Sequence, residues 1–88
     1  MTLKELIQSI SKDIEILDTL TKKSVFGMII DYVAFKIGNH YYLVSKSESP
    51  FYVLTERTAD GSRDISRPKL VKEIGLIDYI KKLLILEN

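Results

Sequence analysis

The arginines of this chain lie together in one short polar segment. All three of them, Arg57, Arg63 and Arg67, fall within TERTADGSRDISRPK at residues 55–69, whereas the lysines are spread through the whole sequence. Guanidinium groups form strong, charge-assisted hydrogen bonds to carboxylates and phosphates. The chemistry that this segment suggests is therefore the pairing of anions, which belong either to the chain itself or to a ligand.

The first interpretation is a hairpin that is braced by its own ion pairs. The dipeptide DG at 60–61 is the strongest turn signal in the sequence. A two-residue loop there sets Arg57 opposite Asp64 and Arg63 opposite Thr58. Charged pairs of this kind protect the edge of a sheet against aggregation. Each exposed pair adds only about 0 to 1 kcal/mol to stability.

The second interpretation is an anion site at the start of a C-terminal helix. Ser66 is a candidate N-cap, and Arg67, Lys69 and Lys72 then fall in the first turns, where the helix dipole is already positive. A bound phosphate or carboxylate would make that placement favourable, although Pro68 removes one backbone donor. The candidate anion or nucleic-acid-binding residues are Arg57, Arg63, Ser66, Arg67, Lys69 and Lys72.

Catalytic chemistry has little support in the sequence. His40 is the single histidine, Asp31 is the one acid inside an apolar run, MIIDYVAF, and the chain has no cysteine. Metal sites with one histidine and no thiolate need clustered carboxylates, and the sequence shows no cluster. It also contains no glycine-rich phosphate loop and no nucleophile elbow. We expect no catalytic residue, no metal, no cofactor and no small-molecule substrate, and hence a protein that is not an enzyme.

The N-terminal segment predicts an amphipathic helix over about the first twenty residues. Thr2 and Glu5 match a capping box, which marks the start of that helix. The apolar stripe that defines its buried side recurs at steps of 4, 3, 4 and 3, at Leu3, Ile7, Ile10, Ile14 and Leu17.

Strand signals occupy the middle of the chain. Residues 25–37 are rich in β-branched and aromatic side chains, and the dipeptide GN at 38–39 predicts a hairpin to a second strand at 40–46. A third strand is expected at 51–57, and a short fourth one at the edge, 62–66, is left open.

A second helix is expected to close the chain. Ser66 is its candidate cap and Pro68 lies in its first turn. Its predicted stripe is Leu70, Ile74, Ile77, Ile80 and Leu84. The fold class is therefore α+β, in a single small domain of residues 1–88: an N-terminal helix, an antiparallel meander of three to four strands and a C-terminal helix, with both helices packed on one sheet face.

The face of the sheet that the helices leave open is expected to be apolar, because residues 25–37 are apolar on both sides of the strand. An uncovered apolar face usually marks a partner. The candidate interface residues are Ile30, Tyr32, Tyr42, Val44, Tyr52 and Leu54.

Two classes of function follow from these features. The leading expectation is a non-enzymatic interaction module, either a homodimer or an accessory subunit that binds another protein through the apolar sheet face. The alternative is a nucleic-acid-binding protein that uses the basic segment 57–72 and the sheet tyrosines. A net charge of +1 argues against strongly electrostatic binding of nucleic acid.

The sequence predicts a cytoplasmic protein without a membrane segment. The N-terminus lacks the basic and apolar regions of a secretory signal. The longest apolar run, residues 25–30, is far shorter than the roughly 20 residues that cross a bilayer.

Overall fold

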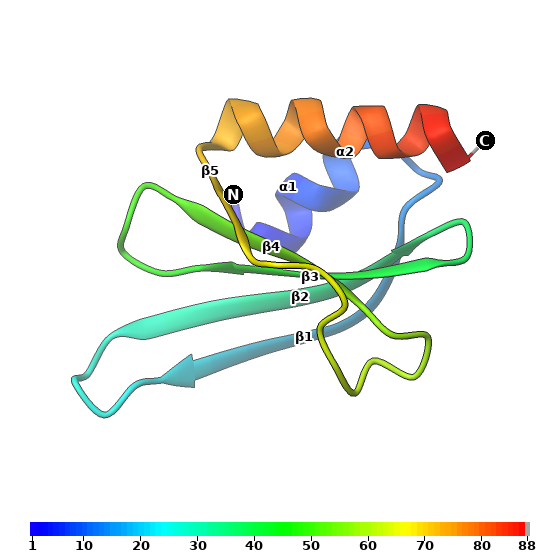
Figure 1. Cartoon of the computed structure of the whole chain (residues 1–88). Coiled ribbons are helices and arrows are strands. Elements are labelled where there is room, and N and C mark those ends of the chain that lie inside the picture. The colour runs from blue at the N-terminus through cyan, green and yellow to red at the C-terminus, as the bar shows by residue number, and fades with distance from the viewer. Residues whose placement is uncertain (88) are drawn as a thin grey trace.

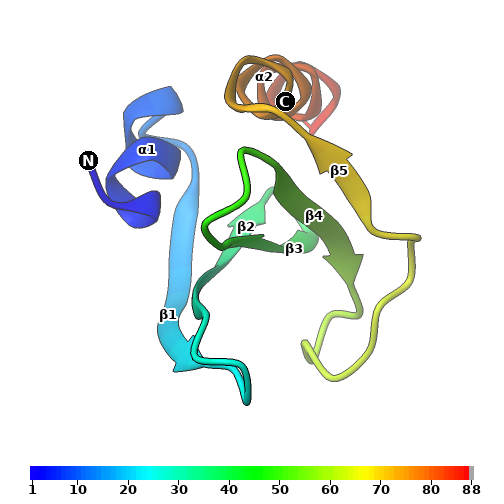
Figure 2. The ribbon, with the colours of Figure 1, turned by 90° about the vertical axis from the view of Figure 1, so that its left-hand side faces the viewer.

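The computed structural model describes residues 1–87, and within them the chain forms the expected α+β fold with an antiparallel meander sheet, which has five strands instead of the expected three to four (Figure 1). The elements are α1 (Leu3–Ile10), β1 (Glu15–Lys23), β2 (Ile29–Ile37), β3 (His40–Lys46), β4 (Tyr52–Arg57), β5 (Lys69–Val71) and α2 (Glu73–Glu87). Each strand pairs with the one before it, in the order β1-β2-β3-β4-β5. Figure 2 shows α1 and α2 side by side over one face of the curved sheet.

The start of α1 is the predicted capping box. The backbone N–H of Thr2 donates to Glu5 Oε1 at 3.0 Å, and the N–H of Glu5 donates to Thr2 Oγ1 at 3.1 Å. These bonds satisfy backbone donors that the first helical turn leaves without partners. Leu3, Leu6 and Ile7 then turn into the core.

The prediction of one long N-terminal helix was wrong beyond Ile10. Ser11 adopts an extended conformation, and its hydroxyl accepts a hydrogen bond from the N–H of Asp13, so the chain turns there. Residues 15–23 become the edge strand β1, in which Leu17 is 44% exposed instead of lying on a buried helical stripe. Pairing along the whole length of β2 outweighs the local helical pattern, because tertiary contacts override weak propensities.

The β2–β3 hairpin forms as predicted, and its turn begins at Gly38 with φ of 60°, in the left-handed region that favours glycine. The preceding strand is shorter than expected. Residues 24–28 form the turn between β1 and β2, in which the N–H of Ser24 donates to the carbonyl of Met28 at 2.7 Å.

The segment after β4 differs from the prediction in two ways. Residues 62–66 are a loop whose strand-like pairing with β4 is limited to one bridge, between Arg57 and Asp64, and the last strand is Lys69–Val71. Helix α2 begins at Glu73 instead of near Ser66. A residue that precedes proline avoids the helical region, so Pro68 favours an extended chain here, and β5 then pairs with β4.

The buried side of α2 matches the predicted stripe only in part: Ile80 is buried, and Ile77 and Leu84 are half-buried against the core. Leu76, Ile80 and Leu83 face the core, whereas Ile74 is exposed and Leu70 belongs to β5. Helix α2 carries apolar residues around most of its circumference, so periodicity alone did not define which side is buried.

The core lies between the helices and the sheet. Phe35 of β2 is fully buried and its ring stacks on Tyr42 of β3, with 5.5 Å between the ring centroids. The other core residues are Leu3, Leu6, Ile7, Ile14, Val33, Ile37, Val44, Tyr52, Leu54, Leu76, Ile80 and Leu83. No helix within residues 1–87 is long and apolar enough to cross a membrane.

Candidate interaction surface

The face of the sheet turned away from α1 and α2 carries an apolar surface. The strand register aligns Leu20, Tyr32, Ser45, Val53 and Leu70 in one row that crosses the sheet. Ala34 and Leu43 are paired in the next row. We call this surface the open face and define it by its apolar members: Leu20, Ile30, Tyr32, Ala34, Leu43, Val53 and Leu70.

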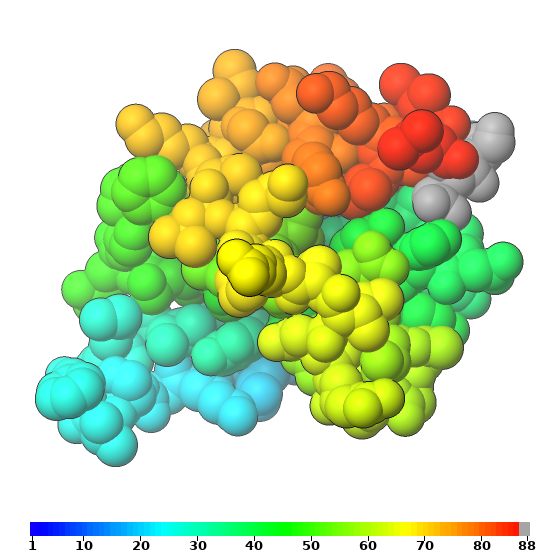
Figure 3. Space-filling view, viewed as in Figure 1, coloured from blue at the N-terminus to red at the C-terminus, as the bar shows by residue number. Residues whose placement is uncertain are grey.

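A shallow cavity of about 310 Å³ lies on the open face. Tyr32, Ala34 and Leu43 are among its apolar lining residues, and Asp18, Lys22 and Arg57 supply charged groups of both signs. In the space-filling view, the 58–66 loop (yellow-green) and the β1–β2 turn (cyan) stand apart, with β2 between them (Figure 3). An apolar centre with a polar rim is the usual anatomy of a protein–protein interface.

Of the six candidate interface residues, Ile30 and Tyr32 lie on the open face. The placement of Tyr42, Val44, Tyr52 and Leu54 on that surface was wrong, because all four are buried under the helices. The register explains the error. Tyr42 pairs with Phe35 and Val44 pairs with Val33, so these side chains share the core face with two buried residues of β2.

Sequence reasoning missed Leu43, Val53 and Leu70, which the register places on the open face. A signal for Leu43 was present. A two-residue hairpin loop at 38–39 pairs residue 43 with Ala34, and directly paired residues point to the same face. Leu20 could not be found in this way, because its segment was assigned to a helix.

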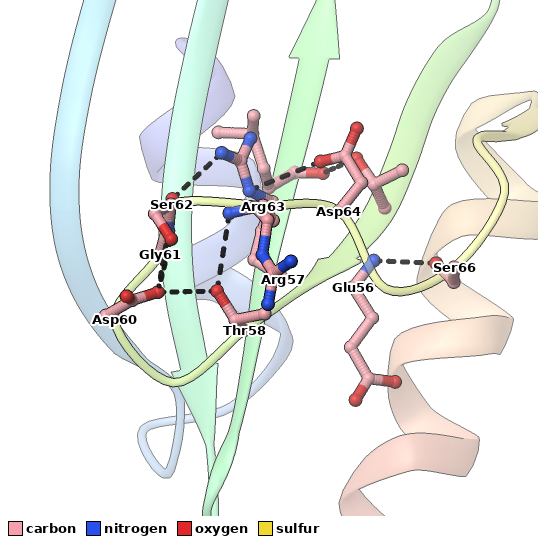
Figure 4. A network of polar contacts seen from close by, with 11 residues as sticks. Glu56, Arg57, Thr58, Asp60, Gly61, Ser62, Arg63, Asp64 and Ser66 are labelled. Atoms are coloured by element: carbon pink, nitrogen blue, oxygen red, sulfur yellow. Dashed lines mark hydrogen bonds and ion pairs between the residues drawn. The ribbon is translucent and has the colours of Figure 1, made fainter.

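The arginine segment forms the braced loop of the first interpretation (Figure 4). Arg57 lies opposite Asp64 as predicted, and its Nε is 3.2 Å from Asp64 Oδ1, at an angle that makes the contact an ion pair without a hydrogen bond. Arg57 Nη2 also donates to the carbonyl of Gly61 at 2.8 Å. The backbone of Arg63 pairs with Thr58, whose N–H donates to the Arg63 carbonyl at 2.9 Å.

Asp60 holds the tip of this loop together. Its Oδ1 accepts hydrogen bonds from the hydroxyl of Thr58 at 2.6 Å, and from the N–H and hydroxyl of Ser62 at 3.0 and 2.7 Å. These donors, led by the Thr58 hydroxyl, lower the pKa of Asp60 to about 2. The loop is therefore internally organised around a carboxylate of its own.

The structure does not gather the candidate anion-binding residues at a helix N-terminus. Ser66 Oγ accepts from the N–H of Glu56 at 2.9 Å and does not cap α2. Lys69 lies in β5, with its Nζ 4.7 Å from the centroid of the Tyr79 ring. The first turn of α2 carries Glu73 instead of cations, which suits the positive end of the helix dipole.

The candidate cations are also divided between the two faces of the sheet. Arg57 lines the cavity on the open face. Arg67 and Lys69 line a separate cavity of about 300 Å³ beside Tyr79 of α2. Lys72 is exposed at the junction of β5 and α2. No single surface therefore collects all of them.

A cavity of about 640 Å³ lies between α1 and the sheet near the start of α2. Several of its polar side chains are bonded within the chain. Thr21 donates to Asp31 at 2.8 Å, Lys46 donates to the carbonyl of Ser47 at 2.7 Å, and the hydroxyl of Tyr52 donates to Glu73 at 3.3 Å. Burial, with a smaller contribution from the Glu73 charge, raises the pKa of Tyr52.

The residues that an enzymatic interpretation needs lie far apart. His40 begins β3, where its Nδ1 is 3.1 Å from Glu56 Oε2, and Asp31 lies near the opposite end of the β2–β3 hairpin. Six residues of strand separate them, or about 20 Å at the usual rise of a strand. Within residues 1–87, no group of three or more His, Cys, Asp or Glu side chains is placed to hold a metal ion.

Fold and surface together define a small α+β protein with a helix-covered sheet face and an open apolar face. Compared with known proteins, the chain matches no family model, no curated protein and no solved structure.

Proposed function

We propose that this chain is a non-enzymatic interaction module that binds another protein through the open face. The observation that carries the proposal is the position of both helices on the same side of the sheet, which leaves the row from Leu20 to Leu70 without cover in residues 1–87. Burial of apolar surface drives protein association, so this face supplies the main attractive contribution.

The charged groups around the open face indicate the chemistry of the partner. Asp18, Lys22 and Arg57 put both signs of charge beside Tyr32 and Leu43. Such a rim suits a protein surface that has its own apolar centre and charges of both signs, because Asp18 and Lys22 then each meet a counterion, while Arg57 is already paired with Asp64. A polyanion such as nucleic acid suits this rim less well, because the negative charge of Asp18 would repel it.

The proposal is tested by photo-crosslinking followed by affinity measurement. A photoreactive benzoylphenylalanine in place of Leu43 should form an adduct with one other protein in extracts of the source cells, and the same group in place of the exposed Ile74 of α2 should not. The adduct identifies the partner, which is then purified. Leu43→Asp should weaken its binding at least about tenfold, whereas Ile74→Asp should leave it unchanged.

Circular dichroism and thermal melting of both variants establish that they remain folded. Equal adducts from positions 43 and 74, or equal affinities of the two aspartate variants, would overturn the proposal. An adduct made only of two copies of this chain would overturn the assignment of the open face to a different protein.

A further inference from the structure

Strand β1 has a free edge. Within residues 1–87 it pairs with β2 alone and ends the sheet, and Figure 2 shows it at one side of the molecule with α1 above its beginning. It is nine residues long, whereas β5 at the opposite end of the sheet has three. An edge strand presents backbone N–H and C=O groups to which another strand can bind. In the single chain one N–H of β1, that of Thr19, donates to the side chain of Asp18 at 2.8 Å.

When two copies of β1 run in opposite directions side by side, the side chains of one copy complement those of the other. On the open face β1 carries Asp18, then Leu20, then Lys22, which pair with Ala34, Tyr32 and Ile30 of β2. In an antiparallel pair centred on Leu20, Asp18 of each copy lies opposite Lys22 of the other, and the two Leu20 side chains meet. On the helix side of the sheet, Thr19 meets Thr21 of the other copy. Opposite charges and paired threonines both stabilise antiparallel strands.

Neighbouring registers lack this complementarity. A pair centred on Asp18 or on Lys22 places like charges directly opposite each other. A pair centred on Thr19 or on Thr21 sets Leu20 against a charged side chain. Like charges that lie opposite each other destabilise a pair of strands, so the register centred on Leu20 is favoured.

We propose that two copies of this chain form a homodimer through antiparallel β1–β1 pairing centred on Leu20. The arrangement has closed two-fold symmetry and joins the sheets of both copies into one. It removes the free edge, and it joins the two open faces at Leu20, which is 48% exposed in the single chain. The proposal rests on the free edge and goes beyond the function proposed for the open face.

Charged residues on edge strands commonly prevent pairing. The test must therefore distinguish charges that attract a second copy of β1 from charges that keep other strands away. Sedimentation equilibrium at tens of micromolar should give twice the chain mass of 10.1 kDa. Asp18→Lys and Lys22→Asp should each raise the dimer dissociation constant at least about tenfold, because each single variant puts like charges opposite each other. The double variant, Asp18→Lys with Lys22→Asp, should restore the dimer, since it exchanges the two ends of the same pair.

A second experiment tests the register. The chain contains no cysteine, so Leu20→Cys introduces a single thiol that meets its own copy across the two-fold axis. Cα atoms of directly opposed residues lie about 4.5 to 5.5 Å apart, within the range of a disulfide. Mild oxidation should therefore give a covalent dimer from Leu20→Cys and not from Ile85→Cys, which places a thiol on an exposed part of α2.

A monomeric wild-type chain, a double variant that stays monomeric although circular dichroism shows it folded, or equal oxidation of the two cysteine variants would overturn the homodimer. Failure of this proposal can be told from failure of the proposed function. Leu43→Asp should leave the dimer intact, and a monomer that still forms a specific adduct at position 43 would overturn the homodimer alone.

Discussion

Asp60 shows at the residue scale how the arginine segment is organised without a ligand. A carboxylate that accepts hydrogen bonds from the Thr58 hydroxyl and from both donors of Ser62 is more stable as an anion. Its folded pKa of about 2 lies below the ordinary value of 3.8. Its contribution to stability is therefore fully present above pH 3.8, and it is lost as the pH falls through about 2.

This organisation predicts an acid-resistant loop tip. In a titration followed by carbon-13 NMR of the side-chain carboxyl, Asp60 should titrate with a midpoint near 2. Ser62→Ala removes one hydroxyl donor and should move the midpoint up, toward 3.8, while Ser49→Ala in the β3–β4 turn should not move it. A wild-type midpoint already at the ordinary value would show that these bonds do not form in solution.

At the element scale, α2 illustrates how packing selects one side of an apolar helix. Leu76, Ile80 and Leu83 lie at positions i, i+4 and i+7 and are buried, although the spacing of Ile74, Ile77 and Ile80 fits a helix equally well. Only Lys72 separates α2 from β5, which is paired with β4, so the position of the strand limits the rotation with which α2 meets the core.

The orientation of α2 predicts different costs for two truncations. Leu76 is 0% exposed and Ile74 is 74% exposed. Leu76→Ala should lower the free energy of unfolding by about 2 to 5 kcal/mol, because it leaves a cavity in the core. Ile74→Ala should change it by less than about 0.5 kcal/mol. Urea denaturation measures both values, and a larger loss at Ile74 would contradict this orientation of the helix.

Charge at the scale of the whole molecule bears on the nucleic-acid alternative. The chain has a net charge of +1. Arg57 is paired with Asp64 on the open face, whereas Arg67 and Lys69 lie near Tyr79 of α2. A phosphate backbone needs several cations on one surface to produce a steep dependence of affinity on salt.

We therefore expect little affinity for nucleic acid. Fluorescence-anisotropy titrations with labelled single- and double-stranded oligonucleotides should show no submicromolar binding at either of two salt concentrations. Submicromolar binding with a steep salt slope, lost in a folded Arg67→Glu, Lys69→Glu double variant, would establish the alternative function instead.

The sequence by itself determined the parts of the fold that depend on local chemistry. The capping box at Thr2, the hairpin at Gly38 and the pairing of Arg57 with Asp64 all follow from side chains that satisfy nearby backbone groups or from the geometry of short turns. These local signals predicted the order of most elements, and that order was sufficient to predict the α+β class and the placement of both helices on one sheet face.

Only the tertiary structure decided which residues form the edge strand and which side chains reach the open face. Residues 15–20 carry the end of the predicted helical pattern, which pairing with β2 overrides, and Tyr42 and Val44 are buried because the register aligns them with Phe35 and Val33. Long-range pairing determines both outcomes. A shift of one residue in a strand exchanges its two faces, and a strand edge exists only once the sheet has formed.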